Sequence, residues 1–441
     1  MHKALLALAM TVALGTTPAA AQLGLIRDAE IEHTVRELSA PIFSAAGISP
    51  SSVRIYLVAD DSLNAFVAGG QNMFLNTGLL ARAETPEQLA GVIAHETGHI
   101  SGGHLVRMSV AAERAAAEQI LATILGAAAV AMGAPQVGSA VILGGEQVAR
   151  QGFLRFTRGQ EQAADQAAIT YLDRADMSAE GLLEFFRILD AQMMLSGSRM
   201  SPYLQTHPLT RDRMTFVERQ VQTRPQPAPL GAAFVERHDR MVAKIAGFLD
   251  NPSRTLQRYQ GDDSFAARYA RAIATFKLND GQGALNQLAE LQALEPNNPF
   301  LHELQGQILF ETGRVREAVA PYARAVELAG REPLIRLGYG RALMESGEEA
   351  RAVEALQLVV QAEPRNAFAW RMLGIARGRI GDLGPSNLAL AEAAILQREL
   401  GEARLFLGRA DQILPPSGRD RQQFFDLEVA LEAADREAQR R

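Results

Sequence analysis

The pattern of apolar and polar positions divides the N-terminal part of the chain into a helix, a strand and a hairpin. Residues 27–46 have helical spacing, and residues 53–60 alternate and are rich in β-branched side chains, as strands are. Residues 64–80 contain two extended pieces around Gly69-Gly70, which is a hairpin signal. The pattern therefore predicts a small sheet close to a helix.

The next predicted helix has clear start and stop signals. Thr85 is a favourable N-cap, Pro86 stands where a helix has no N–H to lose, and Gln88 completes a capping box. The residues Ser-Gly-Gly at 101–103 predict its end. The stretch GVIAHETGHISGGH, residues 91–104, is therefore expected on a helix that follows a small sheet.

Residues 119–145 form a stretch without a charged residue, and its length equals that of a membrane span. Pro135 stands near its middle, glycines interrupt it, and alanine dominates over leucine. These features favour a helical hairpin that covers the stretch at 91–104 or dips into a membrane surface. A true span is the alternative.

A proline-rich segment at residues 223–231 separates two kinds of sequence. Before it, helical patterns cover residues 161–174 and 179–194. After it, three ladders of small residues recur every 34 residues, which is the tetratricopeptide period. The ladders are Gly306, Gly340 and Gly374; Gly313, Gly347 and Gly381; and Ala284, Ala318 and Ala352.

We therefore expect two domains, since 441 residues are too many for one ordinary core. The first covers residues 22–222, the linker covers 223–231, and the repeat domain with its flanking helices covers 232–441. The repeats themselves are expected from about residue 264 to 414.

The N-terminus resembles a secretory signal peptide. Lys3 gives a short basic start, residues 4–15 are apolar, and three alanines at 19–21 precede Gln22. The apolar run is too short to span a bilayer as an uncleaved anchor. We therefore predict a signal peptide at residues 1–21 and an exported, periplasmic mature protein.

Composition excludes several kinds of site. The chain has no cysteine, so it cannot form a disulfide framework, a cysteine zinc site or a thiol nucleophile. Its formal net charge is -6 at pH 7, so the composition gives no sign of the positive charge with which proteins bind nucleic acid.

His95, Glu96 and His99 form the motif H-E-x-x-H. Residues four apart share a helix face, so both imidazoles can hold one ion while Glu96 stands beside it. Two neutral imidazoles, a carboxylate and an open position for water suit zinc. Glu96 would then take the proton of the attacking water and pass it to the leaving amine. An amphipathic helix with solvent-facing histidines is the alternative, which the capping signals disfavour.

The third ligand must come from elsewhere. One class of zinc peptidases uses a histidine six residues after the second, but this position is Leu105, and His104 is one residue short. His104 is expected to pack or hydrogen-bond near the helix end. Another class uses a glutamate on a later helix, where Glu161 would ligate and Asp165, four residues on, would orient a histidine. An ordinary charged helix face is the alternative.

His207 lies in the sequence THP, beside a proline. A histidine held on such a turn could reach the ion or stabilise the oxyanion of the transition state. The alternative is a histidine at the start of a helix.

Three motifs in this order, H-E-T-G-H, E-Q-A-A-D and T-H-P-L-T-R-D-R, resemble the zinc metallopeptidases related to the CAAX prenyl protease and HtpX. The segment 64–80 resembles the strand pair before the zinc helix of that family. The exported start and the repeats resemble its periplasmic BepA-like branch. The resemblance implies a mostly α protein, with a zincin-type α+β metallopeptidase domain that has a small sheet, followed by an α-helical tetratricopeptide solenoid.

The resemblance also implies site roles. Glu96 would be the catalytic base, and His207 can occupy the open metal position and hold the enzyme in check. Ala168 departs from the usual glycine three residues after Asp165. One Zn²⁺ per chain would be bound by His95, His99 and Glu161.

The implied function is an exported zinc-dependent endopeptidase with a chaperone-like role in the quality control and assembly of outer-membrane proteins. Unfolded or stalled outer-membrane proteins would be its clients, and the β-barrel assembly machinery would contact the repeats. Association with the outer membrane, or a peripheral membrane contact through residues 119–145, is part of this hypothesis. The alternative is a latent or inactive peptidase that serves as a repeat-based chaperone or scaffold.

Overall fold

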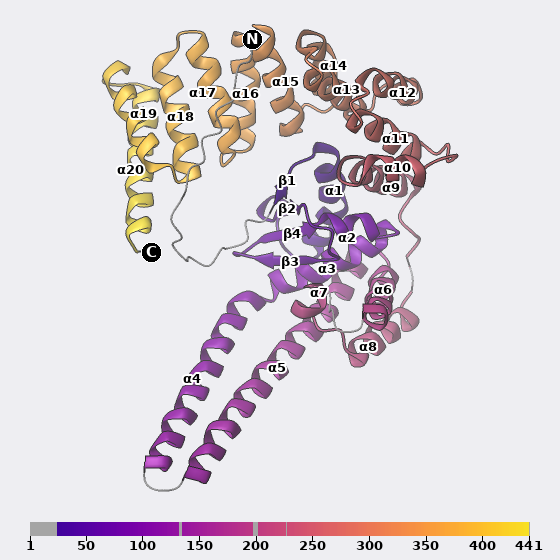
Figure 1. The fold of residues 1–441 in the computed structure, drawn as a ribbon, viewed down its shortest axis with the longest axis vertical. Coiled ribbons are helices and arrows are strands. Elements are labelled where there is room, and N and C mark those ends of the chain that lie inside the picture. The colour runs from indigo at the N-terminus through magenta and orange to yellow at the C-terminus, as the bar shows by residue number, and fades with distance from the viewer. Residues whose placement is uncertain (1–23, 132–134, 197–201, 226, 441) are drawn as a thin grey trace, which may run out of the picture.

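The computed structural model describes residues 24–131, 135–196, 202–225 and 227–440. The predicted signal peptide therefore lies outside the described residues. The described chain is mostly helical, with one small sheet near its N-terminus and an arc of paired helices after it (Figure 1). This confirms the predicted fold class.

The sheet has four strands in the order β1-β2-β4-β3. β2 and β4 are parallel, whereas β1 with β2 and β3 with β4 are antiparallel. β3 and β4 form the predicted hairpin, and Gly69 and Gly70 turn the chain with φ of 57° and 94°. The strands are β1 (Leu25–Ile26), β2 (Arg54–Val58), β3 (Ala65–Ala68) and β4 (Asn72–Asn76).

The second extended piece is shorter than we predicted. It ends at Asn76, and α2 (Thr77–Arg82) follows directly. Leu79 and Leu80 are both fully buried in the main core, which a helix turn permits because successive side chains do not alternate between opposite faces as they do in a strand.

Helices α1 (Ala29–Ala45) and α3 (Pro86–Ser101) pack beside the sheet. The Thr85 cap is as predicted, because its side chain accepts the N–H of Gln88 at 3.3 Å. The return bond of the predicted capping box reaches one residue further back, since the Gln88 side chain accepts the N–H of Glu84, not of Thr85, at 2.9 Å. Gly98 of α3 lies so close to α5 that an added Cβ would stand 2.9 Å from the Ala164 carbonyl oxygen.

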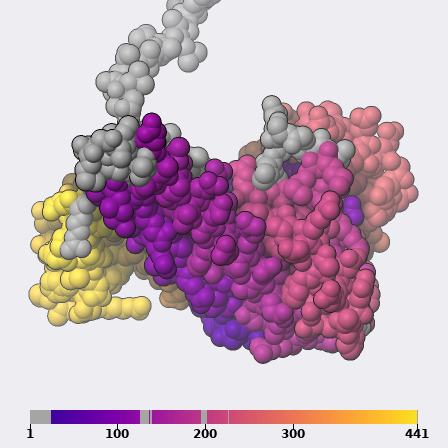
Figure 2. Space-filling model, turned by 90° about the horizontal axis from the view of Figure 1, so that it is seen from below, coloured from indigo at the N-terminus to yellow at the C-terminus, as the bar shows by residue number. Residues whose placement is uncertain are grey.

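Helices α4 (His104–Ala131) and α5 (Pro135–Arg174) form a long antiparallel arm that projects from this unit (Figure 1). Figure 2 shows the molecule from below, the end toward which the arm projects, with the arm in front of the C-terminal repeats. None of the described helices is long and apolar enough to cross a membrane. Large apolar side chains are nevertheless exposed on the arm, including Ile120, Leu121, Ile124, Leu125 and Leu143.

Three further helices complete the first unit: α6 (Glu180–Ser196), α7 (Pro202–Thr206) and α8 (Arg211–Thr223). After the proline-rich segment, α9 (Ala232–Leu249) begins. Met241 and Ile245 of α9 belong to the hydrophobic core of the first unit. Because α9 also packs against α11, it connects the core of the first unit with the helices that follow the proline-rich segment.

The repeats form an arc of antiparallel helices that curves over the β2 side of the sheet (Figure 1). Gly313, Gly347 and Gly381 have φ near 80° and lie at turns between helices, as predicted. The alanine ladder is fully buried. The helices are α10 (Pro252–Arg258), α11 (Phe265–Lys277), α12 (Gly281–Leu294), α13 (Pro299–Glu311), α14 (Val315–Leu328), α15 (Pro333–Ser346), α16 (Glu349–Ala362), α17 (Ala367–Arg379), α18 (Leu383–Gln397), α19 (Leu400–Ile413) and α20 (Arg419–Arg440).

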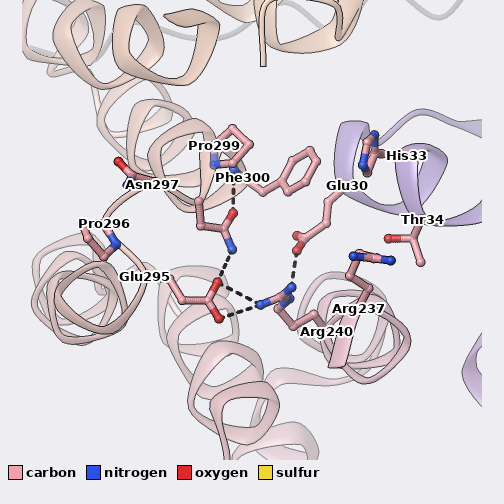
Figure 3. Close-up of a pocket in the computed structure, with 11 residues that line it drawn as sticks. Glu30, His33, Thr34, Arg237, Arg240, Glu295, Pro296, Asn297, Pro299 and Phe300 are labelled. Atoms are coloured by element: carbon pink, nitrogen blue, oxygen red, sulfur yellow. Dashed lines mark hydrogen bonds and ion pairs between the residues drawn. The ribbon is translucent and has the colours of Figure 1, made fainter. Parts of the chain in front are cut away.

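Charged residues connect α1 to this arc. Glu30 lies 3.8 Å from Arg240, whose Nη1 donates to Glu295 at 2.8 Å, as Figure 3 shows. Farther along α1, Arg36 donates to Glu332 at 2.6 Å. The first unit and the repeats therefore share a polar interface along α1.

Candidate metal centre

Four buried side chains bring one donor atom each to a single point. They come from α3, from α5 and from the turn after α7, and the donor atoms all lie within 4.8 Å of one another. The four residues are His95, His99, Glu161 and His207. The structure thus places the three predicted zinc ligands and the further candidate together.

The distances among the first three residues fit a tetrahedral ion. Nε2 of His95 lies 3.1 Å from Nε2 of His99 and 3.3 Å from the Glu161 carboxylate, and Nε2 of His99 lies 3.5 Å from that carboxylate. A tetrahedral zinc with ligands at about 2.0–2.1 Å has ligand pairs about 3.4 Å apart. The donor set therefore fits zinc in both chemistry and spacing.

Two side chains fix the orientation of the imidazoles. Asp165 lies 2.9 Å from Nδ1 of His95, which leaves Nε2 facing the centre. Nδ1 of His104 lies 2.9 Å from Nδ1 of His99. His104 thus takes the hydrogen-bonding position that we expected of it, at the start of α4.

Arg213 of α8 stands behind the two carboxylates. Its guanidinium donates to both oxygens of Asp165, at 2.7 and 2.8 Å, and lies 3.0 Å from Glu161. Nη1 of Arg213 also donates to the carbonyl oxygen of Pro208 at 2.9 Å. The Phe186 ring covers one face of the guanidinium. This buried cation neutralises part of the negative charge of the cluster.

The carboxylate of Glu96 is buried, and neither of its oxygens has a hydrogen-bond partner among the described residues. Burial raises the pKa of this carboxyl above its usual range. Its Oε1 lies 3.6 Å from Nε2 of His207. A basic oxygen without a partner, beside the donor cluster, can accept a proton from a water molecule held there.

His207 is not the first residue of a helix, which was the alternative for it. It follows α7, and its N–H donates to the Tyr203 carbonyl at 2.7 Å. The Tyr203 ring lies against its imidazole with the centroids 4.7 Å apart. Nδ1 of His207 lies 3.2 Å from Glu161, so the ring enters the cluster.

The electrostatics of the cluster favour a bound cation. Burial disfavours a charged His95, but Asp165 and Glu161 outweigh it and raise the pKa of His95 to about 9. Although burial opposes it, contact with His207 and His95 holds the pKa of Glu161 well below its usual range. The carboxylates therefore create a negative potential where an ion would bind.

Comparison with known proteins identifies the family. Residues 26–221 match peptidase family M48, and residues 269–333 and 309–374 match tetratricopeptide repeats. A protease HtpX homolog of Acidiphilium cryptum is 30% identical over 206 residues, which are 41% of this chain and 71% of that protein. The chain belongs to peptidase family M48.

Other relatives match through both parts of the chain. The beta-barrel assembly-enhancing protease of Yersinia pestis is 26% identical over 388 residues, 86% of this chain and 79% of the relative. The protein of that name from Escherichia coli (strain K12) is 27% identical over 395 residues, 88% of this chain and 80% of the relative. The alignments with these relatives thus extend over both the M48 part and the repeat part of this chain.

Sequence reasoning missed the part that Arg213 plays in this M48 site. The residue was visible in the motif T-H-P-L-T-R-D-R, six positions after His207. The signal that could have found it is charge: two adjacent buried carboxylates are expected to have a buried cationic side chain beside them. Nothing in local spacing says which arginine supplies it.

Proposed function

We propose that this M48 protein is an exported zinc-dependent endopeptidase with a chaperone-like role in the quality control and assembly of outer-membrane proteins. The family supports metallopeptidase chemistry, and the names of the relatives support a role in β-barrel assembly. The observation that carries the proposal is the unpartnered, buried Glu96 carboxylate beside four converging donors.

In this mechanism His95, His99 and Glu161 hold the ion, and Asp165 keeps His95 in the ligating orientation. Zinc, when bound, supplies the Lewis acid that activates water and polarises the scissile carbonyl. Glu96 accepts the proton of the attacking water and donates it to the leaving nitrogen, for which a raised pKa is suited.

Substrate is proposed to bind along β3. This strand forms one edge of the sheet and packs next to α3, which carries the histidines. An extended peptide added to β3 would be held by its main chain, so unfolded β-rich chains are suitable substrates. Proline substitutions between Asn64 and Ala68 that left proteolysis unchanged would contradict this.

The domain division and the location belong to the same proposal. We place the peptidase domain at residues 22–222, the linker at 223–231 and the repeat domain at 232–441. The N-terminal pattern of residues 1–21 supports export to the periplasm, and the repeats suit contacts with the assembly machinery. The exposed apolar side chains of the arm support a peripheral membrane contact.

A latent peptidase that works mainly as a scaffold is the second candidate. It is favoured by His207, which brings a fourth donor to the point where a water molecule must bind. Both functions are compatible if a partner withdraws His207.

The first test is the zinc content of the mature chain and of its Glu161→Ala variant. One zinc per wild-type chain and a marked loss in the variant are expected. Cleavage of an unfolded outer-membrane protein should then disappear in Glu96→Gln, which keeps its zinc. A wild-type chain that stays metal-free when zinc is supplied would refute the peptidase and leave the scaffold.

A further inference from the structure

Among the described residues, the strand β2 is paired along only part of its outer edge. β1 places Leu25 opposite Val58 and Ile26 opposite Leu57. Two more residues in this register would put Asp28 opposite Ile55, but Asp28 is the N-cap of α1, and its side chain accepts the N–H of Ile31. The chain therefore leaves the sheet before it covers the first half of β2.

The main chain of Ile55 faces this uncovered edge. The N–H of Arg54 donates to Gln71 at 3.0 Å, toward β4, and that of Ala59 donates to Gly24 at 2.7 Å, toward the side of β1. Because main-chain groups alternate along a strand, residues 55, 57 and 59 point away from β4. Ile55 thus presents one N–H and one C=O where no described strand is paired.

This edge borders a groove of about 800 Å³ between the peptidase domain and the repeats. Its walls are Arg54, Ile55 and Tyr56 of β2, one side of α1, and the turn 362–366 between α16 and α17. Figure 1 shows the β2 side of the sheet turned toward the repeats, with β3 on the far side. The groove is therefore separate from the edge proposed for proteolysis.

The charges that line the groove do not cancel. Arg27 pairs with Glu32 and Glu363, each at 2.6 Å. The one other acidic residue of the lining, Glu37, also has basic partners, since it lies 3.3 Å from His33 and 3.4 Å from Arg237.

Two basic side chains that line the groove have no acidic partner among the described residues. Arg54 and Arg365 are exposed, and neither has an ion-pair partner in the part of the chain that the structure describes. Sheet edges are commonly protected by charges, and here that charge is positive on both walls. A strand that enters the groove is therefore favoured if it carries negative charge.

We infer that an extended, acidic segment of a client polypeptide docks in this groove by adding a strand to the open edge of β2. The main chain of the segment bonds to Ile55, and its carboxylates bind Arg54 and Arg365 from the two walls. The inference rests on the proposed function, because it takes the ligand to be an unfolded client. It adds a holding site that is distinct from the site of cleavage.

The test is peptide binding to the zinc-loaded mature chain in the Glu96→Gln background, where the peptide is not cut. The probe is a fluorescein-labelled peptide of alternating threonine and aspartate, compared with the same peptide carrying lysine for aspartate. We expect the acidic peptide to bind about tenfold more tightly or better. Arg54→Glu combined with Arg365→Glu should reverse the preference, whereas Arg316→Glu, at an exposed arginine of α14, should not.

A second variant tests the strand addition itself. Ile55→Pro removes an N–H that does not serve the β2–β4 ladder, so the fold should be kept while the acidic peptide binds about tenfold more weakly. Unfolding curves check that the sheet is intact. Equal binding of both peptides, or a preference that survives the charge reversal, would overturn the inference. Because no step requires cleavage, this outcome is distinct from failure of the proposed peptidase.

Discussion

Arg213 holds Asp165 through two hydrogen bonds, from Nε at 2.7 Å and from Nη2 at 2.8 Å. Asp165 in turn lies 2.9 Å from Nδ1 of His95, so the guanidinium is linked to this proposed ligand through Asp165. The same guanidinium lies 3.0 Å from Glu161. Arg213 of α8 therefore contacts both carboxylates of α5: Asp165, which orients His95, and Glu161, which is a proposed metal ligand.

Replacing Arg213 by lysine should weaken zinc binding. Lysine keeps the positive charge but cannot donate two bonds to one carboxylate, so Asp165 loses its fixed orientation. Loss of such outer contacts typically costs about 10–100-fold in metal affinity. Competition with a chromophoric chelator measures it. Arg187→Lys, at an exposed arginine of α6, is the control, and equal affinity in both variants would contradict the role given to Arg213.

Replacing His207 by alanine should raise peptidase activity. The three other donors remain, so the zinc content should stay at that of the wild type, while the fourth position opens to water. If the open state is about one tenth populated, the gain is about tenfold. The initial rate of cleavage of an unfolded protein measures it. A fall of about 10²–10³ would instead identify His207 as the group that stabilises the oxyanion.

Local signals in the sequence were enough to predict α3 and two of the three proposed ligands, whereas Glu161 was predicted from a motif of a known class of zinc peptidases. The Thr85 cap fixes where the helix starts, and spacing by four residues places His95 and His99 on one side of it. The repeats were predictable for a related reason, because the same small residue must recur wherever two helices pack in the same way. Gly306, Gly340 and Gly374 each lie against a side chain of the next helix.

Contacts between distant segments could not be predicted. The pair formed by Arg27 and Glu363 spans 336 residues, and no local pattern specifies it. The early end of β4 and the α2 helix after it were missed because apolar residues in a short run fit a buried strand and a buried helix equally well. Tertiary packing decided between the two.

Gly98→Ala should destabilise the peptidase domain and disturb the metal centre. The new Cβ would lie 2.9 Å from the Ala164 carbonyl oxygen, between α3, which carries the histidines, and α5, which carries Glu161. Overpacking of this kind costs roughly 1–3 kcal/mol. Gly152→Ala in α5 is the control, since its Cβ meets nothing within 4 Å, and a gain of about 0.5–1 kcal/mol is expected there. Urea unfolding measures both, and equal effects would disprove the close approach.

The stability of the domain junction should depend on pH through Glu303 of α13. Burial raises the pKa of this carboxyl to about 8; Lys244, 4.0 Å away, opposes the shift, and the acidic Asp28 and Glu30 add to it. Between about pH 4.5 and pH 8 the folded chain therefore binds more protons than the unfolded chain, so this group lowers stability as the pH rises.

Glu303→Gln removes this dependence. Relative to the wild type, the variant should gain on the order of 1–3 kcal/mol at pH 9, where the wild-type carboxylate is charged and poorly solvated, and little at pH 5. Unfolding curves of both chains at a fixed zinc concentration, recorded across this range, give the difference and cancel the titration of the metal centre. The exposed Glu354→Gln is the matched control. A gain that did not grow between pH 5 and pH 8 would show that Lys244 keeps Glu303 ionised, so that the junction is held by a full ion pair.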